Sequence, residues 1–72
     1  MTNSDNEQGP VARLNERGRI ECGRHEFTSG DVVDVAINGT WQVTRIEFDF
    51  GRQRYYSVDG LQLVGHPIRP AG

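Results

Sequence analysis

The chain has 72 residues, 35% of them hydrophobic, with one cysteine and a net charge of −2 at pH 7. This length excludes a second domain, because so short a chain cannot support two separate cores. One cysteine excludes an internal disulfide. With no apolar run near the N-terminus, the composition predicts a soluble cytoplasmic protein without a signal peptide or membrane span.

Charge is unevenly distributed along the chain. Two of the ten acidic residues, Asp5 and Glu7, lie near the N-terminus, so eight acidic residues balance eight arginines from residue 11 onward. The folded part is therefore expected to be neutral. It lacks the overall positive field that gives generic nucleic-acid binders their affinity.

The N-terminal segment is polar, and residues 1–9 cannot bury enough apolar surface to offset the entropy of ordering. We expect residues 1–16 to form a flexible acidic tail and residues 17–72 to form the domain. Between residues 10 and 17 the few apolar side chains suffice for a short strand or one helical turn, and both remain open.

From Gly18 onward, glycines and Asx-Gly pairs recur at short intervals, which is typical of short strands joined by tight turns. The first two strands are predicted at residues 19–22 and 25–28. A turn at Ser29-Gly30-Asp31 follows them, since these residue types favour side-chain hydrogen bonds and positive φ.

A β-hairpin is predicted around Asn38-Gly39, because residues 33–37 alternate apolar and polar before this pair, which favours a type I′ turn. Apolar positions in segment 41–43 keep the inward phase, whereas the apolar positions from Ile46 onward are shifted by one residue. A β-bulge near Thr44-Arg45 would restore the alternation, and we expect one there.

Residues 54–58 predict a further strand with Tyr56 and Val58 inward and Tyr55 and Ser57 outward.

Leu61 and Leu63 are expected to resume the inward face. Prolines in the last segment limit residues 66–69 to an edge strand or an irregular stretch. Five or six short strands within so few residues predict an all-β fold, specifically a small SH3-like barrel of five to six strands.

Candidates for chemistry are few. Cys22-x-x-His25 with His66 is the one possible metal constellation, but it has too few ligands for a zinc site and such residues occur readily by chance. No nucleophile motif or phosphate-binding loop is present. The sequence therefore predicts no enzyme, no metal and no cofactor.

An aromatic and arginine cluster of Arg52, Arg54, Tyr55 and Tyr56 is the most promising binding feature. Guanidinium groups beside aromatic rings can bind phosphate, bases or acidic side chains, and the same residue types dominate protein interfaces. Trp41 is expected to serve mainly the core. The candidate partner-binding residues are Trp41, Arg45, Arg52, Arg54, Tyr55 and Tyr56.

Four segments match a known family: Ile20-Glu21-Cys22-Gly23, the apolar strand Val33 to Ile37, the block Gly39-Thr40-Trp41-Gln42-Val43-Thr44-Arg45-Ile46-Glu47, and Tyr55-Tyr56 with Leu63-Val64-Gly65. In these segments the chain resembles short domains of unknown function carried by phages, plasmids and conjugative elements. The resemblance implies a small β-barrel of mobile-element origin and brings no catalytic residues.

These observations favour a non-enzymatic protein-interaction module, possible as a homodimer through an edge strand. Its sharpest version is an anti-CRISPR-like inhibitor of a host defence complex, since occlusion needs only a surface. One alternative is an SH3-like or OB-like nucleic-acid-binding module. Another is an oligomeric small-ligand binder or enzyme with a site between subunits.

Overall fold

The computed structural model describes residues 9–71, and every regular element in this range is a β-strand. None of the described residues belongs to a helix that could span a membrane. The strands in chain order are β1 (Arg13–Leu14), β2 (Ile20–Cys22), β3 (His25–Phe27), β4 (Val32–Ile37), β5 (Thr40–Asp49), β6 (Arg54–Ser57) and β7 (Ile68–Pro70).

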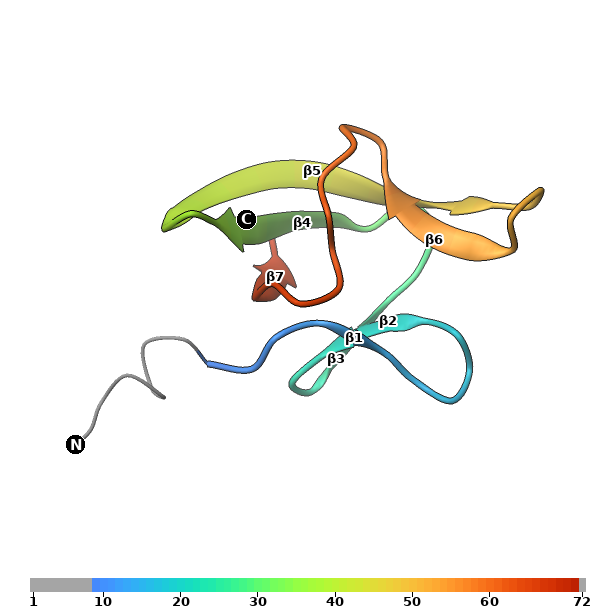
Figure 1. Cartoon of the computed structure of the whole chain (residues 1–72), viewed down its shortest axis with the longest axis horizontal. Coiled ribbons are helices and arrows are strands. Elements are labelled where there is room, and N and C mark those ends of the chain that lie inside the picture. The colour runs from blue at the N-terminus through green and yellow to red at the C-terminus, as the bar shows by residue number, and fades with distance from the viewer. Residues whose placement is uncertain (1–8, 72) are drawn as a thin grey trace.

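The strands form two antiparallel sheets, one in the order β1-β2-β3 and the other in the order β6-β5-β4-β7. Figure 1 shows the three-stranded sheet lying below the four-stranded one. All-β architecture is confirmed, but the predicted closed barrel is wrong for the described residues. The edge of β4 is occupied by β7, whose Pro70 cannot donate a ladder bond to a further strand.

The core lies between the two sheets and draws on both. It includes a segment that the sequence assigned to the flexible tail: Ala12 is buried, and its N–H and C=O bond His66 and Gly65 at 2.8 Å each. The packed unit therefore begins before residue 17, while residues 1–8 of the predicted tail lie outside the described residues. The buried hydrophobic residues are Ala12, Ile20, Cys22, Phe27, Val33, Val35, Ile46, Leu63 and Ile68.

The predicted hairpin between β4 and β5 is confirmed. Asn38 and Gly39 have φ values of 53° and 79°, and a type I′ turn requires positive φ at both central positions. Residues of β4 and β5 pair one to one from Val32 with Arg45 to Ile37 with Thr40. The predicted β-bulge at Thr44-Arg45 is therefore wrong.

The extra residue lies on the opposite strand instead. Gly30 N–H donates to Ile46 C=O at 2.8 Å, and Ile46 N–H donates to Asp31 C=O at 2.9 Å. Two residues, Gly30 and Asp31, therefore lie opposite the single residue Ile46. Gly30 has φ 91°, as the first position of a glycine bulge requires. Beyond Ile46, β5 pairs with β6 rather than β4.

Alternation along residues 41–44 of β5 and along β6 is the reverse of the predicted one, whereas Ile46 is buried as predicted. Thr44 and Ser57 are buried, whereas Trp41, Tyr56 and Val58 are exposed. A polar contact explains the inversion, because the Thr44 and Ser57 hydroxyls lie 2.8 Å apart in the interior. Strict alternation then continues through Ile46 with no change of phase.

This polar pair is satisfied on every side. Thr44 Oγ1 donates to Asp59 Oδ2 at 2.7 Å, so the proton between the two hydroxyls must come from Ser57. Ser57 Oγ in turn accepts the N–H groups of Asp59 and Leu61, each at 3.2 Å. The hydroxyl pair therefore fixes the loop that follows β6.

Beyond that loop the prediction was correct for the side chains that face inward. Leu63 is buried and Leu61 packs against the core, although neither residue belongs to a strand. The final segment forms the edge strand β7 on β4, with Val35 opposite Ile68.

Candidate interaction face

The four-stranded sheet turns one face toward the core and leaves the other uncovered within the described structure. Residues that pair across antiparallel strands share a face, so the register assigns each side chain to one side. Large apolar side chains exposed on this uncovered side, named the outer face hereafter, are Val32, Trp41, Val43, Tyr56 and Val58. Its charged residues are Asp34, Arg45, Glu47, Asp49, Arg54 and Arg69.

Trp41 anchors one end of the outer face. The Arg69 guanidinium carbon lies 3.9 Å from the centre of its ring, and Arg69 Nε also lies 3.3 Å from Asp34 Oδ2. Held from two sides, the arginine covers one surface of the indole, yet Trp41 remains 43% exposed. A rigid, half-exposed indole is suited to insertion into a partner's pocket.

The middle of the outer face is apolar with paired charges beside it. Val43 is 62% exposed and lies opposite Asp34, while Arg45 Nε lies 2.8 Å from Glu47 Oε2. Three arginines and three carboxylates balance on this face, so it presents no net field to a polyanion. Within residues 9–71, Arg54 forms no ion pair.

The structure separates the predicted aromatic and arginine cluster. Arg54 and Tyr56 lie on the outer face together with Trp41 and Arg45. Tyr55 points inward and packs edge-to-face on Phe48, with ring centroids 4.8 Å apart.

Arg52 lies in the turn between β5 and β6, outside the strands whose register defines the outer face. The backbone N–H of Arg52 donates to Asp49 Oδ1 at 3.2 Å, and Arg52 Nε lies 4.0 Å from Oδ2 of the same carboxylate.

Sequence reasoning missed Val32, Val43, Val58 and Arg69 as members of the outer face. For Val43 and Val58 the error came from assigning their positions to the buried phase, whereas Val32 and Arg69 lie on β4 and β7 and were not among the candidate binding residues. Reading Thr44 as an interior residue would have placed Val43 outside, and the strand register would then have assigned its cross-strand neighbours to the same face.

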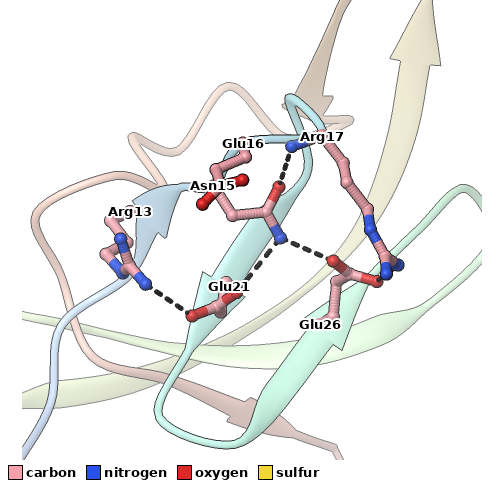
Figure 2. A pocket seen from close by; sticks show the side chains of 6 residues that line it. All are labelled: Arg13, Asn15, Glu16, Arg17, Glu21 and Glu26. Atoms are coloured by element: carbon pink, nitrogen blue, oxygen red, sulfur yellow. Dashed lines mark hydrogen bonds and ion pairs between the residues drawn. The ribbon is translucent and has the colours of Figure 1, made fainter.

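A polar pocket on the other sheet is the second candidate site, shown in Figure 2. Glu21 and Glu26 are directly opposed on β2 and β3, an arrangement that is unfavourable for like charges. The amide of Asn15 bridges them, donating to Glu21 Oε1 at 3.1 Å and to Glu26 Oε2 at 2.5 Å. Arg13 Nη2 donates to Glu21 Oε2 at 2.8 Å.

These contacts pair the carboxylates of Glu21 and Glu26 with hydrogen-bond donors from the same pocket. Hydrogen bonds from Asn15 and then Arg13 hold the pKa of Glu21 below its ordinary value. Asn15 Oδ1 accepts the N–H groups of Arg17 and Arg19, at 2.9 and 3.1 Å, which fixes the loop between β1 and β2. We therefore assign this network a structural role.

The three residues considered for a metal do not share a common site in the described structure. Cys22 is buried, and its Sγ lies 3.4 Å from both Pro10 O and Ile68 N, so the thiol is part of the core. His66 Nδ1 lies 3.0 Å from the C=O of Gln62. Among the described residues, no three His, Cys, Asp or Glu side chains are grouped to hold a metal ion.

Comparison with known proteins gives one result. No curated protein and no solved structure matches the chain. A family model described as a domain of unknown function, DUF5348, matches residues 12–69. Its start coincides with buried Ala12, in agreement with the packed unit defined above. The chain therefore belongs to the DUF5348 family of domains of unknown function.

Proposed function

We propose that this chain is a non-enzymatic protein-interaction module that binds a protein partner through the outer face. The observation that carries the proposal is the row of exposed apolar side chains on one sheet surface, with Trp41 and Tyr56 among them. Tryptophan, tyrosine and arginine supply most binding hot spots in protein interfaces. Exposed large apolar side chains gathered on one surface are characteristic of interaction sites.

Electrostatics favour a protein over a nucleic acid as the partner. Arg45 and Arg69 are already paired with carboxylates of the same sheet, so few guanidinium groups are free to neutralise phosphates. Nucleic-acid binding stays the alternative, because Trp41 and Tyr56 could also stack on bases. Its affinity would fall steeply as salt is raised.

The specific partner that we propose is a host defence complex inhibited by occlusion. Support comes from the small size of the chain and from its resemblance to short domains of mobile elements. An inhibitor of this type needs a stable surface and no chemistry, and roughly 800 Å² per partner suffices for a specific complex.

The test is affinity purification of the tagged full chain from host lysate, with and without nuclease, followed by mass spectrometry. We expect a nuclease-resistant partner that Trp41→Ser loses, with an affinity at least roughly 30-fold weaker, as for a hot spot of about 2 kcal/mol. Phe50→Ser is the matched control, because Phe50 is an aromatic residue 83% exposed in the β5–β6 turn.

Each other result contradicts the proposal. A partner retained equally by both variants would place the binding site elsewhere on the molecule. Loss of every partner on nuclease treatment would establish the nucleic-acid alternative.

A further inference from the structure

The strand β6 is an edge of the four-stranded sheet with unused hydrogen-bonding groups. Val58 N–H donates to Arg45 C=O at 3.0 Å. Because an antiparallel ladder alternates, the main-chain groups of Tyr56 also point toward β5, and those of Tyr55 and Ser57 point away. Ser57 C=O accepts Gly60 N–H at 2.9 Å, but within residues 9–71 the N–H groups of Tyr55 and Ser57 and the C=O of Tyr55 have no partner.

The other sheet edges carry features that discourage pairing. On β7, Pro70 lies opposite Val33 and has no N–H to offer. On β3, Glu26 places a charge at the edge, and β1 has only two residues. Natural proteins protect edge strands in these ways; β6 has no proline, and its one charged residue, Arg54, lies at the start of the strand.

An apolar groove of about 330 Å³ borders β6. It is lined in part by Leu14, Leu61, Leu63 and Val64, of which Leu14 and Val64 are exposed. A strand that paired with β6 would lie beside this groove and shield its apolar residues from water.

We propose that a second copy of this chain pairs with β6, the two β6 strands running antiparallel about a twofold axis at Tyr56. Tyr55 and Ser57 flank Tyr56 symmetrically, so this axis sets each Ser57 N–H against the Tyr55 C=O of the second copy. The two Ser57 N–H to Tyr55 C=O bonds carry the pairing, because each Ser57 C=O already accepts the Gly60 N–H of its own chain at 2.9 Å. The interface is isologous.

Side-chain charges also fit a second copy. In this register the two Tyr56 rings are cross-strand neighbours on the outer face, a favourable aromatic pair. The two Arg54 side chains lie at opposite ends of the paired strands, about 14 Å apart, so they do not repel at contact distance. Each lies diagonally beside the other copy's Tyr56, where a cation–π contact is available to Arg54, which has no ion pair within residues 9–71.

The small size of the hydrophobic core also favours a second copy of the chain as the partner of β6. Within residues 9–71 nine hydrophobic residues are buried, which is a modest core, and small domains are commonly stabilised by oligomerisation. Four-residue strands make a small interface, so we expect a dimer that forms with increasing concentration.

Site-directed cross-linking of the full chain under mild oxidation tests the register. Residues at the axis form a non-hydrogen-bonded pair with Cα atoms about 4.5 Å apart, which a disulfide can bridge. We expect Tyr56→Cys to cross-link into a covalent dimer and wild type not to, because Cys22 is buried. Wild type should sediment as a monomer–dimer mixture that shifts with concentration.

Two control variants make the test specific. Arg54→Cys places thiols about 14 Å apart, too far for a disulfide. Val43→Cys reports random collision, because Val43 is more exposed than Tyr56. Wild type that sediments only as a monomer at the highest concentration reached would overturn the proposal. Equal cross-linking at positions 43 and 56, or preferential cross-linking at 54, would do so as well.

Discussion

Removing the Ser57 hydroxyl should destabilise the protein far more than removing the exposed tyrosine beside it. Ser57→Ala deprives two N–H groups, those of Asp59 and Leu61, of their acceptor, and deprives Thr44 Oγ1 of its donor. Leaving one buried polar group unsatisfied costs roughly 1–3 kcal/mol. We therefore expect a loss of at least about 2 kcal/mol, or a Tm lowered by roughly 8–16 °C for a chain of this size.

Thermal and urea unfolding followed by circular dichroism measure this loss. At a protein concentration where the chain is monomeric, Tyr56→Ala is the matched control, and its cost should stay within roughly 0.5 kcal/mol, because the side chain is on the outer face. Thr44→Val should be strongly coupled to Ser57→Ala, with an interaction energy of roughly 0.5–3 kcal/mol in the double variant.

The opposite pattern would refute the reasoning. If Tyr56 and Val58 were the inward residues, as the sequence pattern predicts, Ser57→Ala would be nearly neutral. Tyr56→Ala would then cost roughly 3–5 kcal/mol, as for other large aromatic residues truncated in a core.

Three further predictions concern the remaining parts of the fold. Asn15→Asp should lower the Tm at neutral pH, because a third carboxylate joins Glu21 and Glu26, and high salt should reduce the loss. Contacts in the folded state lower the pKa of Glu21 below its ordinary value of 4.5. The stability that these contacts contribute is therefore present above pH 4.5 and is lost as the pH falls through the pKa of the folded state. Glu21→Gln should flatten the acid side of a Tm–pH profile, and an unchanged profile would contradict the assignment. Gly39→Val should cost about 1–2 kcal/mol in urea unfolding, because valine is strained at φ 79°, whereas Gly51→Ala, with no positive φ, should be close to neutral.

Local turn chemistry made much of the fold predictable. Asn38-Gly39 specifies its hairpin because few residue pairs accept positive φ twice in succession. Proline limited residues 66–69 to an edge strand or an irregular stretch, and residues 68–70 form the edge strand β7. These features depend on neighbours in the chain, so the sequence displays them directly.

Long-range contacts decided the parts that were not predictable. Ser57 is buried because Thr44, thirteen residues away, supplies a hydroxyl on the facing strand. No local pattern reveals such a pair, so Tyr56 was predicted inside and Tyr55 outside. The closed barrel failed for a similar reason, since nothing in the prolines of β7 shows which strand edge they will occupy.

The candidate site was predictable in composition and less so in geometry. Trp41, Arg45, Arg54 and Tyr56 do share one face, although they were chosen for residue type alone. Their aliphatic neighbours were missed because the exposed phase of β5 was taken for the buried one.

The most direct test of the outer face as a binding surface uses the single tryptophan of the chain. Labelling with 5-fluorotryptophan gives one fluorine resonance, from Trp41, which the captured partner can be titrated against by NMR. We predict that saturating partner shifts this resonance and abolishes its sensitivity to H₂O–D₂O exchange, since binding would bury the exposed part of the indole. A resonance that keeps its position and its solvent sensitivity in the saturated complex would contradict the account.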